Sequence, residues 1–219
     1  MQYDRDDPGY DTLATFDIET THYKPAEGET VSVGVAVHDR TTDELTYEPF
    51  HRDGADDEAE TIADALEFVE DCGADALVSY NGIDFDLDFL SDRLYRLGAD
   101  NVVAAADLDP HIDVFADRKA VCDRTGKKWP KLEECLASYG FDEPVTEWGG
   151  QPVTNTRFGE ELGPAYLAAL ADGDRDRAET LREVIDHYLV TDLEANLAIY
   201  HGDAGLEFEP EYLGTRASF

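Results

Sequence analysis

The sequence contains few basic residues. Among its 219 residues, 17 are Lys or Arg and 51 are Asp or Glu, which leaves a formal net charge of −34 at pH 7. Self-repulsion of this size destabilises a compact chain at ordinary ionic strength. At about 1 M salt the Debye length falls to roughly 3 Å, and most of that repulsion is screened. The acidic residues are spread along the chain rather than collected in one patch, so we favour a halophilic cytoplasm over a cationic partner as the reason for the charge.

Cysteine is also scarce, and long apolar runs are missing. The three cysteines, Cys72, Cys122 and Cys135, are far apart and show no C-x-x-C spacing. They indicate neither a disulfide framework nor a zinc site, and they fit a reducing compartment. The N-terminus lacks the apolar segment of a signal peptide, and no run is long enough to span a membrane. We therefore expect a soluble cytoplasmic protein without a membrane partner.

Patterns along the chain predict three strands first and then alternating strands and helices. Period-two alternation predicts strands and helical spacing predicts helices. The expected strands cover 12–19, 30–38, 45–50, 76–80, about 111–115 and, more weakly, 206–208. The expected helices cover 57–71, 86–97, 130–140, 164–171 and 175–200. We expect residues 1–11 to be a loose lead-in and 141–163 to be a long loop. This order predicts one α/β domain over 1–219, with its core at about 12–200 and helices on both faces of a mixed sheet.

The first strand carries two carboxylates on one face. Asp17 and Glu19 are two residues apart, so on a strand their side chains point the same way. Burial of such a pair forces one carboxyl to take up a proton, whereas a divalent cation removes the conflict. Mg²⁺ and Mn²⁺ prefer oxygen ligands of this kind. A solvated acidic strand end stays the alternative, because Asp-x-Glu recurs at Asp56 and Asp192.

A second candidate follows the strand expected at 76–80. Asn81-Gly82 turns the backbone there, and aspartates follow at the mouth of the next helix. In open α/β sheets, ligands bind beyond the carboxyl ends of the strands. Taken alone, the stretch also fits an ordinary loop and helix cap.

A third candidate lies in the last long helix. Tyr188 and Asp192 are four residues apart, so they share a helix face one turn apart. Taken alone, such a pair is more often a solvated acidic face beside a half-buried tyrosine.

Together the three stretches resemble a known family. Asp17-Ile18-Glu19, Asn81-x-x-x-Phe85-Asp86 and Tyr188-x-x-x-Asp192 stand in the order and at the separations of the three exonuclease motifs of the DEDD 3′–5′ exonucleases. The resemblance is strongest to the proofreading exonuclease domain of family-B DNA polymerases and its stand-alone relatives. That family has a ribonuclease-H-like fold, in which antiparallel strands 1–3 are followed by parallel strands. The likeness spans roughly 12–200, which leaves no room for a polymerase domain.

The resemblance implies a role for each matching residue. Four carboxylates would hold two divalent cations, Mg²⁺ or Mn²⁺: Asp17, Glu19, Asp86 and Asp192. Two such ions stabilise the attacking and leaving oxygens of an in-line displacement. Tyr188 would position the attacking water, and Asn81 and Phe85 would lie near the terminal nucleotides.

Two of these assignments have rivals. Asp84 and Asp88 also follow Asn81, but the Phe-Asp pairing of the family's motif favours Asp86. His187 has the spacing to Asp192 that the histidine branch of the family uses. On an uninterrupted helix, five residues set His187 about 140° away from Asp192, against about 40° for Tyr188. We therefore favour Tyr188.

One stretch stands out as basic. Residues 111–131 contain six basic and three acidic residues, a net charge of +3 in a chain of −34. Trp129 lies within it, and a basic track with an interleaved aromatic suits single-stranded nucleic acid. We predict that Lys127 and Lys128 contact the substrate backbone; local charge pairing on a solvated surface is the alternative.

The leading hypothesis is a metal-dependent 3′–5′ exonuclease acting on single-stranded nucleic acid, DNA more than RNA. A second hypothesis keeps the site but trims RNA or hydrolyses a small nucleotide ester. A third is a non-catalytic nucleic-acid-binding module of the same fold, which the presence of all four carboxylates argues against. The sequence contains no recognisable reader of the 2′-hydroxyl, so both sugars stay open.

Overall fold

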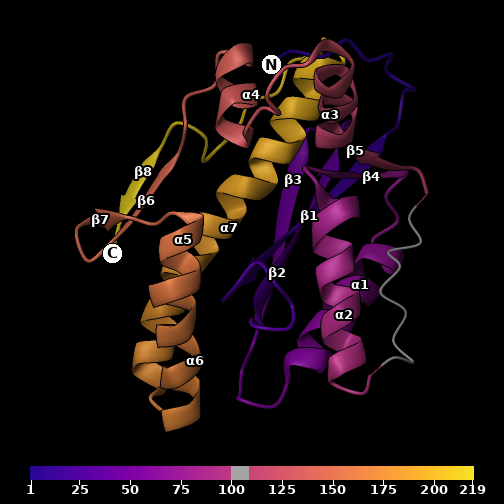
Figure 1. Ribbon diagram of the computed structural model, residues 1–219. Helices are drawn as coiled ribbons and strands as arrows, with labels where there is room; N and C mark the ends of the chain where they lie inside the picture. The colour runs from indigo at the N-terminus through magenta and orange to yellow at the C-terminus, as the bar shows by residue number, and fades with distance from the viewer. Residues whose placement is uncertain (100–108) are drawn as a thin grey trace.

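The first three strands form the antiparallel meander that their alternating patterns predict. In the computed structural model, which describes residues 1–99 and 109–219, these strands are β1 (Thr12–Thr20), β2 (Thr30–Asp39) and β3 (Glu44–His51). The strands β4 (Ala76–Ser79) and β5 (His111–Asp113) join the other edge of β1 in parallel, which gives the order β3-β2-β1-β4-β5 (Figure 1). The predicted mixed sheet is therefore confirmed, and the carboxyl ends of β1 and β4 are neighbours.

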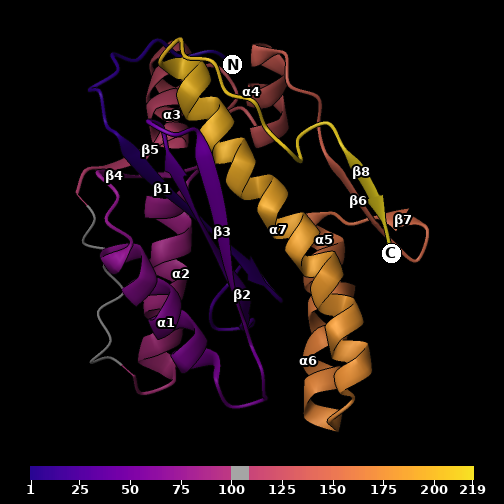
Figure 2. The same cartoon turned by 180° about the vertical axis from the view of Figure 1, so that it is seen from behind.

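Helices cover both faces of this sheet (Figures 1 and 2). The helices α1 (Glu58–Asp71) and α2 (Leu87–Arg96) pack on the face that carries Phe16 and Leu77. The other face carries Leu13 and Val78 and is covered by three helices: α3 (Val114–Thr125), α4 (Leu132–Tyr139) and the second half of α7 (Arg175–Asp203). Successive strand residues thus enter different cores, as the strand pleat requires.

The first half of α7 extends past the sheet and has its own packing partners. A third core joins it to α6 (Gly163–Asp172) and to the short π-helical turn η2 (Phe158–Leu162), which follows α5 (Asn155–Arg157). A second, small sheet has the order β7-β6-β8 and consists of β6 (Val145–Trp148), β7 (Gln151–Pro152) and β8 (Arg216–Ser218). None of the helices within 1–99 and 109–219 combines the length and the apolar character needed to cross a bilayer.

The prediction of a long loop over 141–163 is wrong. Short elements fill most of it, and contacts distant in sequence hold them: β6 pairs in parallel with β8 at the C-terminus. The prediction of a strand near 206–208 is also wrong, because the only strand after α7 in the described chain is β8. Buried Glu194 of α7 holds the intervening segment, since its carboxylate accepts hydrogen bonds from three successive backbone N–H groups at 211–213.

Helix α3 replaces the last two residues of the strand expected at 111–115. The strand β5 ends at Asp113, and the helix begins at Val114. Its buried residues include Val114, Arg118 and Cys122, so an arginine stands at the centre of the buried stripe. A fully buried arginine is rare unless it is paired, and this one is paired to Asp203 of α7. Hydrophobic periodicity cannot detect such a helix.

The first eleven residues are not a loose lead-in. The backbone N–H of Arg5 donates to the carbonyl of Asp203 at 3.0 Å, and the side chain of Gln2 donates to the carbonyl of Ser138 at 2.7 Å. The guanidinium of Arg5 also pairs with the carboxylate of Asp117. These polar contacts, which have no sequence pattern of their own, dock the segment on α3, α4 and α7.

Candidate active site

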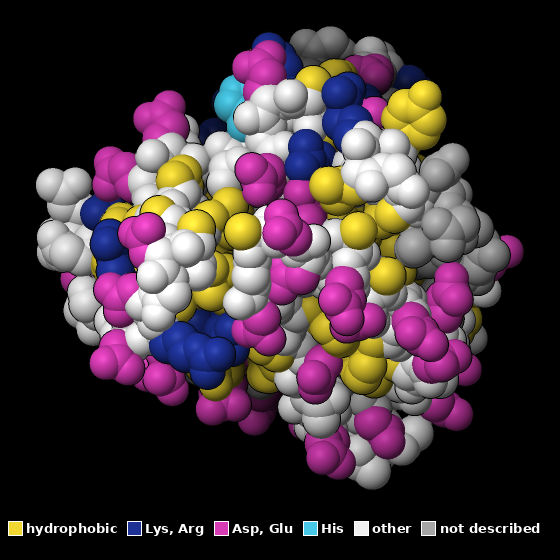
Figure 3. All heavy atoms as spheres, turned by 90° about the horizontal axis from the view of Figure 1, so that it is seen from below, with side chains coloured by type: hydrophobic (Ala, Val, Ile, Leu, Met, Phe, Trp, Pro, Cys, Tyr) yellow, Lys and Arg dark blue, Asp and Glu magenta, His cyan; other side chains and the backbone are white. Residues whose placement is uncertain are grey.

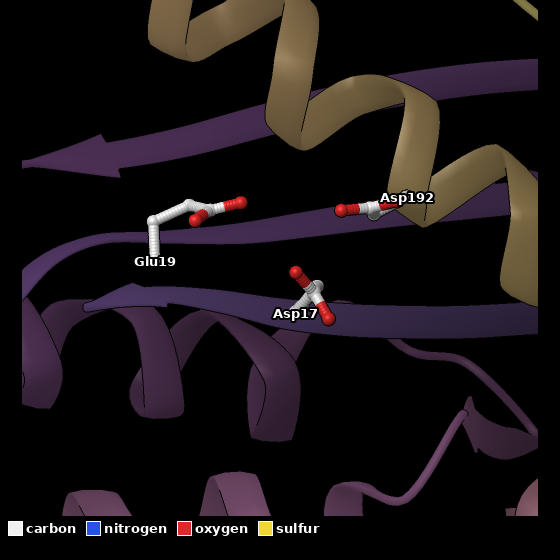
Figure 4. Close-up of side chains that lie close together, drawn as sticks. All are labelled: Asp17, Glu19 and Asp192. Carbon is white, nitrogen blue, oxygen red and sulfur yellow. The ribbon is translucent and has the colours of Figure 1, made fainter. Parts of the chain in front are cut away.

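Three carboxylates meet where the carboxyl end of β1 faces the middle of α7. Asp17, Glu19 and Asp192 each offer a carboxylate oxygen, and these oxygens all lie within 4.8 Å of one another. Figure 4 shows the three side chains converging from the strand and the helix. The first and third motifs, which are about 170 residues apart in the sequence, are thus brought together.

The fourth predicted carboxylate, Asp86, lines the same cavity. It ends the π-helical turn η1 (Gly82–Asp86), which follows β4, and it is only 5% exposed. The group of three does not include it, but its negative charge contributes to raising the pKa of both Asp17 and Glu19. The tight turn needs Gly82, because a Cβ there would lie 2.5 Å from the hydroxyl of Ser79.

Asp113 holds the turn that presents Asp86. Its carboxylate accepts hydrogen bonds from the backbone N–H groups of Asn81 at 2.9 Å and Ile83 at 3.3 Å. It also caps α3 by accepting from Phe115 at 2.9 Å. Asn81 adopts the left-handed conformation, with φ of 68°, which asparagine tolerates better than most residues. One buried carboxylate therefore ties the end of β4 to β5 and α3.

Burial and repulsion from nearby carboxylates raise the pKa of all four carboxyls. Burial is the largest cause in each case. The charge of Asp192 adds to the effect at Asp17, Glu19 and Asp86. The pKa of Asp192 itself rises to about 7, with a contribution from Glu133. Negative charge in this site is costly to maintain without a cation.

The residues fit a pair of divalent cations. No lysine, arginine or histidine in the described chain forms an ion pair with any of the four carboxylates. The donors are all hard carboxylate oxygens, which suit Mg²⁺ and Mn²⁺. Two dications would balance four carboxylate charges, so they would remove the repulsion that raises the pKa values.

The carboxylates line a cavity of about 600 Å³. Seven of the nine residues singled out from the sequence line it: Asp17, Glu19, Asn81, Phe85, Asp86, Tyr188 and Asp192. Tyr80 and Phe115 also line the cavity, and the centres of their aromatic rings are 5.1 Å apart. A volume of this size is in the range of small-ligand sites.

Tyr188 and His187 have different surroundings. The hydroxyl of Tyr188 donates to the side-chain oxygen of Asn155 at 2.6 Å, and its ring stacks on Phe158 with centres 5.7 Å apart. The charges of nearby carboxylates, in addition to burial, raise its pKa. His187 is outside the cavity lining, and its Nδ1 lies 2.7 Å from the hydroxyl of Thr146 on β6. The helix runs uninterrupted between His187 and Asp192. On such a helix Tyr188, rather than His187, lies on the same face as Asp192.

The basic residues of 111–131 are divided between the core and the surface. Arg118 is fully buried in its ion pair. The Nζ of Lys119 lies 2.8 Å from a carboxylate oxygen of Asp84 and 5.0 Å from the ring centre of Trp129. The stretch is therefore not one continuous cationic face.

The two lysines predicted to contact substrate do not line the cavity. Lys127 and Lys128 are exposed on the connection between α3 and α4. Lys131 directly precedes α4 and is the one Lys or Arg among the described residues of the cavity wall. Contact with substrate at Lys127 and Lys128 stays a prediction, and it requires a strand that extends beyond the cavity.

The sequence patterns did not predict some of the residues that line the cavity. Thr146, Asn155 and Glu143 come from the segment expected to be a loop, and Glu133 comes from α4. The only signal for them was the length of that segment, since long loops in compact domains are often functional.

A family comparison agrees with the observed fold. The model of the RNase_H superfamily family RNase_H_2 matches residues 14–159. No match was found among curated proteins.

Solved structures that match this chain include polymerase and exonuclease chains. The family B DNA polymerase from the hyperthermophilic archaeon Pyrobaculum calidifontis has a TM-score of 0.60 at 18% identity, over 87% of this chain and 24% of that chain. An apo exonuclease I has a TM-score of 0.45 at 16% identity, over 94% of this chain and 43% of that one. Exonuclease I of E. coli in complex with a 5cy-dA13 oligonucleotide has a TM-score of 0.41 at 15% identity, over 84% and 45%. The chain therefore spans about a quarter of the polymerase and less than half of the exonuclease.

Proposed function

This chain belongs to the RNase H superfamily, and from that premise we propose that it is a two-metal-ion 3′–5′ exonuclease acting on single-stranded nucleic acid, with DNA as the favoured substrate. The observation that carries the proposal is the meeting of four unpaired carboxylates from three separate motifs in one cavity. The ribonuclease-H-like fold alone would not be sufficient, because one fold hosts many functions.

The four carboxylates are the ligands in this proposal. Asp17, Glu19, Asp86 and Asp192 would hold two Mg²⁺ or Mn²⁺ ions. When bound, such ions lower the pKa of water and stabilise the charge that develops on phosphate oxygens. Glu19 and Asp86 are buried, and the low exposure of charged groups strengthens electrostatic interactions within the site.

Tyr188 orients the attacking water. It stands one helical turn from Asp192, and both residues line the cavity. A phenol with a raised pKa stays protonated near neutral pH, so it serves as a hydrogen-bonding group rather than as a base. Its role is to hold the water in line with the phosphorus.

Aromatic rings support a single strand as the substrate. Phe85 and Phe115 line the cavity, and Phe115 contacts Trp129 with ring centres 6.1 Å apart. Trp129 is 46% exposed, so the aromatic series leads from the cavity to the surface. Stacking on such rings contributes about 1–3 kcal/mol per base and is tolerant of sequence. Asn81, which lies beside Phe85 in the cavity, would contact the terminal nucleotide.

A degradation assay tests the proposal. A 5′-labelled single-stranded DNA should shorten stepwise and release mononucleotides from its 3′ end, strictly in the presence of Mg²⁺ or Mn²⁺. Asp86→Asn should abolish activity because it removes a ligand charge. Asp88→Asn is the matched control, since this exposed neighbour lies outside the cavity lining and should keep full activity.

Other outcomes would contradict the proposal. Undiminished cleavage in EDTA, or loss from the 5′ end, would exclude this mechanism. Parallel assays on RNA and on a small chromogenic nucleotide ester measure the two alternative substrates. Binding of oligonucleotide without any turnover would instead identify a non-catalytic module.

A further inference from the structure

Tyr188 is held by a segment that the three sequence motifs do not include. Asn155 is the first residue of α5 and lines the cavity, and its side-chain oxygen accepts the hydroxyl proton of Tyr188 at 2.6 Å. Three residues on, the ring of Phe158 stacks on Tyr188 with an interplanar angle of 21°. Phe158 is 1% exposed, so this platform is fixed in the core.

The segment itself is tied to both catalytic elements. The hydroxyl of Thr154 accepts from the N–H of Arg157 at 3.2 Å and so caps the short helix. Gly159 lies against the backbone just beyond β1, since a Cβ there would be 3.0 Å from the carbonyl oxygen of Thr21. The segment thus bridges the carboxyl end of β1 and the middle of α7, the two elements that carry Asp17 and Asp192.

A hydroxyl group has one proton to donate and two lone pairs to accept with. While that proton is donated to Asn155, the oxygen of Tyr188 offers only acceptor capacity to the rest of the cavity. It can then accept a hydrogen bond from a water but cannot donate to a carboxylate or to a phosphate oxygen. The direction of one hydrogen bond therefore decides which partner the tyrosine selects.

We propose that Asn155 is a positioning residue that directs the hydroxyl proton of Tyr188 away from the carboxylates, so that Tyr188 accepts a hydrogen bond from the attacking water. This inference rests on the proposed exonuclease function. Without an acceptor at 155, the hydroxyl would turn its proton towards the negative charges in the cavity, and its lone pairs would no longer be directed at the attacking water.

Kinetics at saturating substrate test the inference. Asn155→Leu should lower kcat about threefold to tenfold, which corresponds to one neutral hydrogen bond, and leave KM nearly unchanged. In a Tyr188→Phe background the same change should have no further effect, because the hydroxyl that it directs is already gone. Asn155→Asp should restore kcat to within about twofold, since a carboxylate at this position also accepts. Thr156→Ala is the control: this exposed neighbour lies outside the cavity lining, and its kcat should not change.

A spectroscopic measurement tests the same hydrogen bond without turnover. The Raman doublet of a tyrosine ring reports whether its hydroxyl donates or accepts, and the difference between wild type and Tyr188→Phe isolates this ring. The donor signature should be present in the wild type and in Asn155→Asp and absent in Asn155→Leu.

The possible failures are distinguishable. An acceptor signature in the wild type, loss of kcat in Asn155→Asp equal to that in Asn155→Leu, or additive losses in the double variant would overturn the inference and leave the exonuclease proposal intact. A wild type that degrades no nucleic acid would overturn both.

Discussion

The carboxyl of Asp192 couples the stability of the protein to pH. Its pKa is about 7 in the folded protein, against an ordinary value of 3.8. The folded state therefore binds this proton more tightly than the unfolded state does. The resulting stability is fully present below the unfolded pKa and is lost as the pH rises through about 7. Each unit of pKa difference corresponds to about 1.4 kcal/mol, so the loss is on the order of a few kcal/mol.

We therefore expect the melting temperature in EDTA to fall as the pH rises from about 4 to about 7.5. The raised pKa values of Asp17, Glu19 and Asp86 act with the same sign. Asp192→Asn should flatten the decline, and Mg²⁺ should restore stability at the upper end, because it binds the folded protein with ionised ligands. Thermal unfolding followed by circular dichroism at constant KCl measures this. A melting temperature that rises over this range and is unaffected by Asp192→Asn would contradict the account.

Substitutions at the neighbouring residues Tyr188 and His187 should affect different properties, the first kcat and the second the melting temperature. Tyr188→Phe keeps the ring on Phe158 and deletes the hydroxyl, so kcat should fall about 10²- to 10⁴-fold, as for other proton-positioning groups. His187→Ala removes the contact with Thr146 and should lower the melting temperature while kcat stays within a few-fold. Steady-state kinetics and unfolding of both variants check this. An inactive His187→Ala beside a nearly normal Tyr188→Phe would place the chain in the histidine branch.

The pairing of residues within the first and third motifs could be predicted from spacing, whereas the joining of the three motifs in one site was predicted from the family resemblance. Strand alternation places Asp17 and Glu19 on one face, and helical spacing aligns Tyr188 with Asp192. Asn155 and Phe158 could not be predicted, because their importance arises only from contact with Tyr188, some 30 residues later. Lys127 and Lys128 belong to the basic stretch but lie outside the cavity, so their contact with substrate stays a prediction.

Helices and strands were predictable where one apolar face dominates. The alternating β2 and the amphipathic α2 agree with their expected ranges to within one residue at each end. Prediction failed for α3, whose buried stripe contains Arg118, and for the short elements of 141–163, whose hydrogen bonds come from other parts of the chain. Elements that depend on buried ion pairs or on distant strands carry no local signal.

The connection between α3 and α4 allows a test of how the substrate reaches the cavity. Lys131 lines the cavity, whereas Lys127 and Lys128 are exposed beyond it. Lys131→Ala should raise KM for oligonucleotides of any length. The double variant Lys127→Glu, Lys128→Glu should raise KM for long oligonucleotides only, with little change in kcat, as expected for lost uniform binding. KM measured on a trinucleotide and on a longer strand separates the two, and a double variant that weakens both equally would point to a structural role.

The charge of the molecule as a single body sets the conditions under which it folds. On the face that Figure 3 shows, acidic side chains are spread over most of the surface, and Lys and Arg occupy only a few places. Few basic side chains are therefore available to neutralise the net charge of −34 locally. Among the ion pairs of the described chain, those with both partners at least partly exposed contribute at most about 1 kcal/mol each. Such pairs cannot offset long-range repulsion.

We expect the melting temperature to rise as KCl increases from dilute buffer towards about 2 M, because screening shortens the range of the repulsion. The same salt weakens contacts between lysine and phosphate by reducing counterion release. Under the proposed function, substrate binding in these conditions would depend on the metal ions and on stacking. Phe85→Ala should therefore raise KM more, relative to wild type, at high KCl than at low KCl.

A charge-reduced variant provides the matched control for the salt effect. Glu60, Asp64 and Glu67 lie on the exposed side of α1 and form no ion pair or side-chain hydrogen bond in the described structure. Replacing them by Gln, Asn and Gln removes three negative charges without touching the core or the cavity. At low KCl this variant should melt at a higher temperature than the wild type, and the two should converge as the salt rises. If the wild-type melting temperature does not depend on KCl, or if the variant gains nothing at low salt, the repulsion is balanced locally and the halophile hypothesis is wrong.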